Sequence, residues 1–203
     1  MKKRVAQIRR KTKETDISVK LNIDGSGKSK IDTGIGIFDH MLELFTFHGL
    51  FDLELKAKGD LKVDIHHTNE DVGIVLGEAF KEALGENKKG IKRFGSITVP
   101  MEDVLASVAV DISGRGHLKL NIAEKKAFVA KAEEGYLFLD AQHFFESFAK
   151  HLGMNLAITV NFLSQDLHTT LEPIFKGLGI ALDQATQIDP RRKGVPSTKG
   201  VID

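Results

Sequence analysis

The chain has no cysteine, almost no net charge and no long apolar run, and each absence excludes a class of protein. Without cysteine it can form neither a disulfide nor a thiolate metal site, so any metal must be held by histidine and carboxylate side chains. A formal net charge of +1 on 203 residues argues against a nucleic-acid-binding protein. No apolar run reaches the length of a membrane span, and the basic residues 1–4 precede no apolar signal core. We therefore expect a cytoplasmic enzyme or binding protein that contacts neither nucleic acid nor membrane.

The hydrophobic pattern predicts the same order of strands and helices in each half of the chain. In the first half it predicts strands at 5–10, 17–23, 29–32 and 51–55 and helices at 38–48 and 69–84. In the second half it predicts strands at 95–99, 104–113, 117–122 and 154–162 and helices at 140–152 and 169–185. The turn at 24–27 should start a hairpin, residues 85–90 form a polar connector, and residues 123–135 are poorly patterned. We expect an internally duplicated α+β fold, a single domain of two repeats (about 1–90 and 91–186) with an irregular functional tail at 187–203.

Residues 64–71 contain two imidazoles and a carboxylate within five positions. If this stretch opens a helix, His66 and Glu70 lie one turn apart on one face and can chelate one metal ion. His67 points about 100° away, at 3.6 residues per turn, and must contact something else. The same residues are also typical of an ordinary helix N-terminus whose polar side chains are solvated.

The second half repeats this motif 102 residues later, where Asp166 to Glu172 match Asp64 to Glu70. A lone histidine precedes each copy at nearly the same spacing, His40 in the first half and His143 in the second. Chance does not readily place a histidine and a His-x-x-x-Glu at matched spacing in both halves. The repeat therefore predicts that these residues bind metal.

Two similar halves that face each other would be related by an approximate two-fold axis. Each ion could then take the His-x-x-x-Glu clamp of one half and loose imidazoles of the other. The first predicted site comprises His40, His67, His168 and Glu172. The second comprises His66, Glu70, His143 and position 169, where a threonine stands in place of the expected histidine. Such nitrogen-rich shells suit Mn²⁺ and argue against Mg²⁺ and Ca²⁺, while Zn²⁺ and Fe²⁺ also accept these ligands.

Eight stretches, in order, give the chain a resemblance to a known family: residues 10–15, 24–27, 33–42, 48–53, 66–73, 93–95, 111–115 and 196–200. Through them the chain resembles the imidazoleglycerol-phosphate dehydratases over essentially its whole length. The resemblance implies a ribosomal protein S5 domain 2-like fold in which each half is a four-stranded sheet packed on two helices. It implies two Mn²⁺ ions per active site. It also implies an assembly of 24 chains built from trimers, with active sites between subunits.

The resemblance also implies an activity, the dehydration of imidazole glycerol phosphate to imidazole acetol phosphate in histidine biosynthesis. The catalytic positions that match are Glu14, His66, His67, Glu70, His168 and Glu172. Glu14 matches an acid/base glutamate that also contacts the substrate. The phosphate-binding positions that match are Arg93, Arg115, Lys176, Ser197, Thr198 and Lys199. His48, His117 and His151 have no partner in the duplication and are assigned structural or surface roles.

The chain departs from the family pattern at one loop and one metal site. Thr169 replaces a histidine, residues 164–166 replace Gly-x-Asn, and Pro173 replaces an alanine. We expect the second site to bind its ion more weakly, or to recruit water or Asp166 instead of the missing imidazole. Two alternatives follow: a metal-stabilised assembly that has lost catalysis, or an enzyme of the same fold acting on another phosphorylated substrate, for instance a hydrolase.

Overall fold

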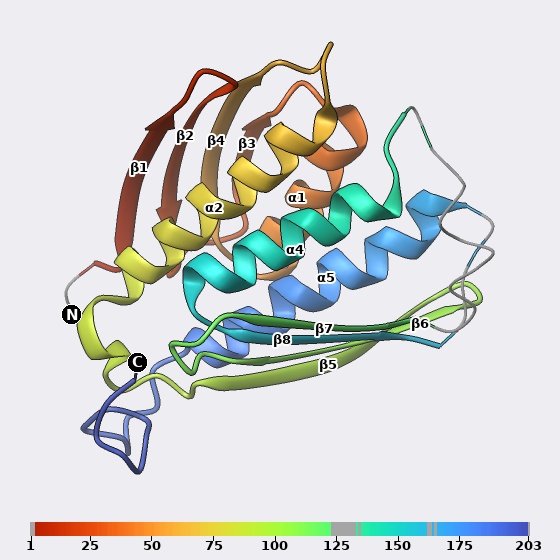
Figure 1. Ribbon diagram of the computed structural model, residues 1–203. Coiled ribbons are helices and arrows are strands. Elements are labelled where there is room, and N and C mark those ends of the chain that lie inside the picture. The colour runs from red at the N-terminus through yellow and green to blue at the C-terminus, as the bar shows by residue number, and fades with distance from the viewer. Residues whose placement is uncertain (1–2, 123–132, 134, 162–163, 165, 203) are drawn as a thin grey trace.

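The computed structural model describes residues 3–122, 133, 135–161, 164 and 166–202. Within them, two four-stranded mixed sheets enclose a layer of helices (Figure 1). The first sheet has the order β1 (Val5–Lys11), β2 (Thr15–Asn22), β4 (Asp52–Gly59) and β3 (Ser29–Asp32). The second has the order β5 (Phe94–Met101), β6 (Val104–Asp111), β8 (Asn155–Val160) and β7 (His117–Ile122). The last pair in each sheet, β3 with β4 and β7 with β8, is parallel and the other pairs are antiparallel, so the predicted duplicated α+β fold is confirmed.

The helix layer consists of two pairs, one from each half. Helices α1 (Gly36–His48) and α2 (Ile65–Leu84) cover the first sheet, and α4 (Phe138–Leu152) and α5 (Leu167–Thr186) cover the second. Across the layer α2 packs on α4 and α1 packs on α5. A short 3₁₀ turn, Glu86–Lys88, follows α2. Because α1 and α2 of one half meet α4 and α5 of the other, residues from both halves can reach a shared site.

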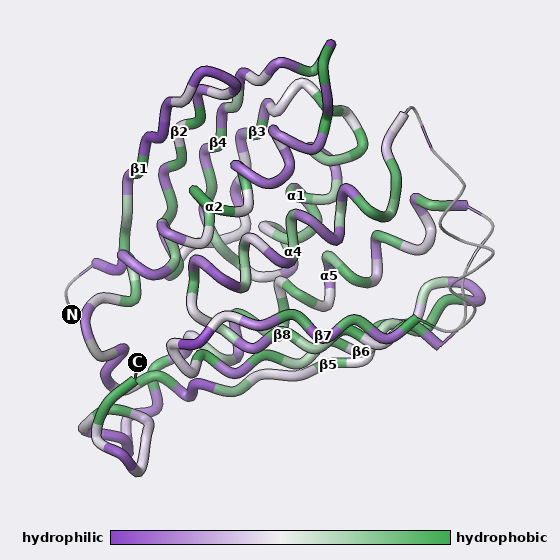
Figure 2. Tube along the Cα trace, in the orientation of Figure 1, coloured by the Kyte–Doolittle hydropathy of each residue, from purple (hydrophilic) through white to green (hydrophobic). Residues whose placement is uncertain are grey.

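The core forms because each strand and helix buries one apolar face. Along the helices, apolar and polar residues recur turn by turn (Figure 2), and the buried ones make up the core between the helices and the sheets. Phenylalanines fill the middle layer, and Phe45, Phe80 and Phe148 lie with ring centroids 5.6–6.0 Å apart. Two glycines that repeat with the duplication let helices touch: a Cβ on Gly77 would lie 2.9 Å from the Phe148 carbonyl of α4, and one on Gly179 would lie 2.3 Å from the Phe45 carbonyl of α1.

The hairpin predicted at residues 24–27 is wrong, because β2 and β3 are not neighbours and β4 lies between them. The carboxylate of Asp52, at the start of β4, accepts hydrogen bonds from the backbone N–H groups of Ser26 (2.8 Å) and Lys28 (3.2 Å). The turn therefore wraps around the start of β4 and carries the chain to its far side.

Several predicted elements are longer in the structure. Helix α2 begins at Ile65, four residues before the predicted start, and therefore includes both adjacent histidines. Strand β4 extends to Gly59 rather than ending at residue 55. Of the poorly patterned stretch 123–135, all but residues 133 and 135 lies outside the described residues, as does the predicted strand end at residue 162. Among the described residues, no helix combines the length and apolar character needed to cross a membrane.

Candidate functional site

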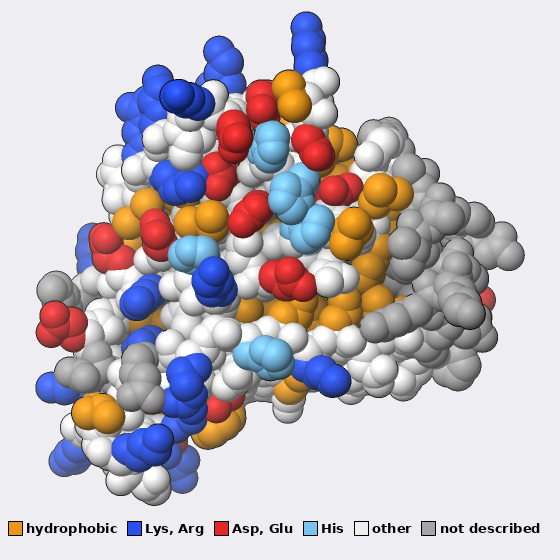
Figure 3. Space-filling view, viewed as in Figure 1, with side chains coloured by type: hydrophobic (Ala, Val, Ile, Leu, Met, Phe, Trp, Pro, Cys, Tyr) orange, Lys and Arg blue, Asp and Glu red, His pale blue; other side chains and the backbone are white. Residues whose placement is uncertain are grey.

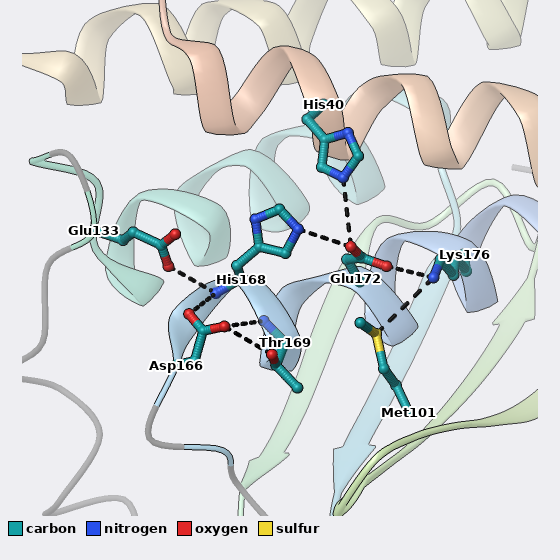
Figure 4. Close-up of polar contacts among 8 residues, drawn as sticks. All are labelled: His40, Met101, Glu133, Asp166, His168, Thr169, Glu172 and Lys176. Atoms are coloured by element: carbon teal, nitrogen blue, oxygen red, sulfur yellow. Dashed lines mark hydrogen bonds and ion pairs between the residues drawn. The ribbon is translucent and has the colours of Figure 1, made fainter.

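The second copy of the His-x-x-x-Glu motif forms the first turn and a half of α5. Asp166 caps the helix, and its carboxylate accepts a hydrogen bond from the His168 backbone N–H at 3.1 Å. One turn separates His168 from Glu172, and the His168 Nε2 atom lies 2.7 Å from Glu172 Oε1 (Figure 4). The predicted clamp is therefore formed by side chains that already face one another.

His40 reaches this clamp from α1, in the other half of the chain. Its Nε2 atom lies 3.4 Å from Glu172 Oε1, and its ring stacks on that of His168 with centroids 4.9 Å apart. Ligand atoms of His40, His168 and Glu172 all lie within 4.8 Å of one another. We call these three residues the first cluster. Two imidazole nitrogens and a carboxylate oxygen at this spacing are a donor set that fits a divalent transition metal.

The first copy of the motif makes a related arrangement, which we call the second cluster: His66, Glu70 and His143. Asp64 caps α2 by accepting from the His66 backbone N–H at 2.9 Å. His66 Nε2 lies 3.1 Å from Glu70 Oε2. The Nδ1 atoms of His66 and His143 are 2.5 Å apart, and His143 comes from α4 in the other half. His66 therefore turns a different ring nitrogen toward each partner, Nε2 toward Glu70 and Nδ1 toward His143. The three side chains are of metal-binding types. Among the described residues, however, the group that brings three ligand atoms within 4.8 Å of one another is the first cluster.

His67 lies apart from the first cluster in this chain. Its Nδ1 atom is 3.1 Å from Asp60 Oδ1, at the end of β4. The hydrogen bond with Asp60 raises the pKa of His67, and the nearby charge of Glu14 acts in the same direction. Glu14 stands in the β1–β2 turn, where its backbone N–H donates to the Thr12 hydroxyl. Glu14, Asp60 and His67 therefore form a separate polar group.

Thr169 occupies the place where the duplication calls for an imidazole. Its hydroxyl donates to Asp166 at 2.7 Å, and only 7% of the residue is exposed. That hydrogen bond is the largest cause that lowers the pKa of Asp166. Helix α5 continues through Pro173, which has no N–H to donate to the Thr169 carbonyl four residues earlier. Both Thr169 and Asp166 are thus engaged in capping α5.

The predicted phosphate-binding residues lie in three places. Arg93 forms a two-pronged ion pair with Asp111 (2.6 and 3.0 Å), which raises the pKa of Arg93, and also donates to the Pro196 carbonyl at 3.0 Å. This contact places Arg93 next to the tail turn that holds Ser197, Thr198 and Lys199, where the Ser197 hydroxyl accepts from the Lys199 N–H. Arg115 lies in the turn after β6, where its N–H donates to the Ser113 hydroxyl. Lys176 lies on α5 instead.

The chain is similar in sequence and in fold to known proteins. A family model described as imidazoleglycerol-phosphate dehydratase matches residues 33–182. The enzyme of that name from Pelobacter propionicus is 52% identical over 199 residues, covering 98% of this chain and 99% of its own. Crystal structures of the enzymes from Pyrococcus furiosus (38% identical, TM-score 0.79) and Staphylococcus aureus (31%, TM-score 0.77) cover 96% and 91% of this chain and 99% of their own.

The chain belongs to the imidazoleglycerol-phosphate dehydratase family. The predicted family and enzyme class, a hydro-lyase of histidine biosynthesis, are confirmed. Within this dehydratase a His/Glu cluster that could bind metal is present, as predicted. Figure 3 shows histidine and acidic side chains gathered on one face of the dehydratase, over the helix layer.

Lys176 pairs with the carboxylate of the first cluster in this dehydratase. Its ammonium forms an ion pair with Glu172 Oε2 and lies 3.9 Å from the Met101 sulfur (Figure 4). Burial would raise the pKa of Glu172, but Lys176, His168 and His40 together outweigh burial and lower it. Glu172 is therefore held as the carboxylate, the form that can bind a cation.

Two residues of the dehydratase site were not anticipated from the sequence. His48 follows His40 by eight residues on α1. Burial lowers its pKa most, and the charge of Lys176, whose ammonium pairs with Glu172, adds to that lowering. The i, i+8 spacing was the available signal. Glu133, in the poorly patterned stretch, accepts a hydrogen bond from the His168 N–H at 3.0 Å, and no periodicity marked it.

Proposed function

We propose that this dehydratase converts imidazole glycerol phosphate to imidazole acetol phosphate, with one divalent ion held by each cluster. The observation that carries the proposal is that each His-x-x-x-Glu clamp meets a histidine from the opposite half of the chain, His40 for one and His143 for the other. Three-ligand sets of this kind leave positions free for a substrate atom. Mn²⁺ is our choice of ion, supported by the mixed nitrogen and oxygen donors.

The chain's own residues then have separate tasks. When bound, the divalent ions supply Lewis acidity that favours the deprotonated form of an imidazole ring. Glu14, which is exposed on its turn and whose charge acts on His67, would take the proton from the substrate carbon. His66, His67, Glu70, His168 and Glu172 would hold and orient the ring.

The phosphate would be bound by cationic and hydroxyl groups. The hydrogen bond from Arg93 to the Pro196 carbonyl, next in the chain to Ser197, supports grouping Arg93 with the tail residues Ser197, Thr198 and Lys199. Arg115 and Lys176 complete the proposed set. This assignment makes the tail at 187–203 a functional segment of the single duplicated domain.

Self-association is a further part of the proposal. His67 stands with Asp60 and Glu14, apart from the first cluster, so its expected place in the first site requires a neighbouring subunit. We propose the family's assembly of 24 chains built from trimers, which native mass spectrometry or light scattering would measure.

Turnover tests the proposed reaction. Metal-stripped enzyme, reloaded with Mn²⁺, should convert imidazole glycerol phosphate to imidazole acetol phosphate without releasing inorganic phosphate, followed by ³¹P NMR. H168A should abolish turnover, while the control H117A, on an exposed strand position, should retain it. Release of inorganic phosphate would favour the hydrolase, and an assembled protein with no turnover would favour the purely structural role.

A further inference from the structure

A buried hydrogen bond joins the two elements that carry the second cluster. The Tyr136 hydroxyl donates to the Asn69 side-chain oxygen at 2.8 Å, and both residues are fully buried. A buried polar pair of this kind is costly if either partner is left unsatisfied, so the bond fixes the position of both side chains.

Each end of this bond is rigidly tied to a metal ligand. Asn69 lies between His66 and Glu70 in α2, and its amide nitrogen also donates to the Ile65 carbonyl at 3.1 Å. Tyr136 lies two residues before α4, which carries His143, and its ring stacks on Phe38 with centroids 6.0 Å apart. The bond therefore sets the first turns of α2 against the start of α4.

The same segment continues to the first cluster. The backbones of Tyr136 and Glu133 exchange two hydrogen bonds, of 2.8 and 3.0 Å. The Glu133 carboxylate accepts in turn from the His168 N–H, at the start of α5 (Figure 4). On the α5 side, Glu133 bonds to the backbone N–H of His168. On the α2 side, Tyr136 bonds to the side chain of Asn69, in the same helical turn as the predicted ligands.

The two copies of the motif differ at this point. The residue equivalent to Asn69 in the second copy is Leu171, which is also fully buried. The fold can therefore fill this position with an apolar side chain, and the Tyr136–Asn69 bond is a feature of the α2 clamp alone. It occurs at the cluster whose fourth expected imidazole is replaced by Thr169.

We propose that Tyr136 is a positioning residue for the second cluster: its bond to Asn69 holds the turn of α2 that carries His66 and Glu70 against the start of α4, the helix of His143. These three side chains can then serve one ion where a fourth imidazole is missing. The proposal rests on the metal-binding role proposed above. It concerns placement, since Tyr136 itself touches neither the ion nor the substrate.

Metal affinity tests the proposal site by site. The H40A background reports the ion of the second cluster, and the H143A background reports that of the first. In each background, Mn²⁺ binding to the metal-stripped full chain is measured by calorimetry and by the electron paramagnetic resonance of free Mn²⁺. Y136F should raise the dissociation constant at least fivefold in the H40A background and by less than twofold in the H143A background.

A second variant separates placement from stability. Y136F/N69L replaces the polar pair by an apolar pair and gives α2 the residue that α5 has at this position. Its denaturation midpoint should recover toward that of the parent, because no buried polar group is left unpaired, while the weakened Mn²⁺ affinity should persist.

Several results would overturn the proposal: no change in affinity, an equal change in both backgrounds, or an affinity that recovers together with stability. Absence of an ion on the second cluster of the parent enzyme would also overturn it. That last result would also remove the second ion from the proposed function. A parent enzyme that binds both ions but shows no turnover would refute the proposed function alone, and a parent enzyme that turns over while Y136F leaves Mn²⁺ affinity unchanged would refute the role of Tyr136 alone.

Discussion

Gly179 sets the distance between α1 and α5, and thus between His40 and Glu172. A Cβ at this position would lie 2.3 Å from the Phe45 carbonyl oxygen and 2.9 Å from the Gly49 nitrogen. Both neighbours are backbone atoms, which cannot rotate away. Replacing Gly179 with alanine must therefore move one helix relative to the other.

Two opposing effects decide the size of the change in stability. Alanine within a helix gains about 1 kcal/mol over glycine. Overpacking of a close contact costs about 1–3 kcal/mol and sometimes more, and an overlap against backbone belongs at the upper end. We expect G179A to lower the free energy of unfolding by about 1–2 kcal/mol, which for a chain of this length is a fall of about 2–8 °C in melting temperature.

The displacement should also be visible at the metal. Because α1 carries His40 and α5 carries His168 and Glu172, G179A should weaken Mn²⁺ binding at the first cluster more than at the second. The measurements are denaturant unfolding of the metal-stripped chain and Mn²⁺ titration. G194A is the control, since a Cβ there meets nothing within 4 Å. If G179A were as stable as G194A, with unchanged affinity, the close approach of α1 and α5 would not constrain the first cluster.

Three further substitutions probe the site and the fold. T169H should lower the dissociation constant of the second ion at least tenfold, measured by equilibrium dialysis, because it restores the imidazole that the duplication calls for. An unchanged dissociation constant would count against the two-fold arrangement. E14Q should lower kcat by about 10²–10⁴-fold while leaving Mn²⁺ affinity unchanged, and a combined loss of both would instead make Glu14 a ligand. Hydrogen bonds from Ser26 and Lys28 lower the pKa of Asp52, so its stabilising effect is present above its ordinary pKa and lost as the pH falls below about 4. D52N should therefore flatten the acid side of the stability profile, measured by denaturant unfolding at pH 2.5–7.

The sequence predicted the arrangement of the fold because the hydrophobic pattern is strong in both halves. Its errors are local and have identifiable causes. The early start of α2 is set by the side chain of Asp64, which caps the helix at a point where no apolar periodicity has begun. The hairpin was predicted wrongly because the turn is held by a hydrogen bond from Ser26 to Asp52, 26 positions later in the chain. A local sequence pattern cannot reveal such a contact.

The candidate site was predictable to the extent that it repeats. The approximate two-fold relation between the halves predicted that each lone histidine would meet the clamp of the other half, and the contacts of His40 with Glu172 and of His143 with His66 are present. Contacts without a counterpart in the other half could not be predicted in this way. The pairing of His67 with Asp60 depends on how the end of β4 meets the start of α2. That of Lys176 with Glu172 is an i, i+4 contact within α5, which the sequence spacing could have indicated.

Tyr136 is the sole tyrosine of a chain that contains no tryptophan. When the unlabelled enzyme is excited at a wavelength that phenylalanine does not absorb, the ultraviolet emission of each chain therefore comes from a single ring, where α2 meets the segment that leads into α4. Loss of that ring's hydroxyl contact, on heating or on metal removal, can be followed by this emission without any dye. The signal then reports one defined contact between elements rather than an average over many aromatic residues.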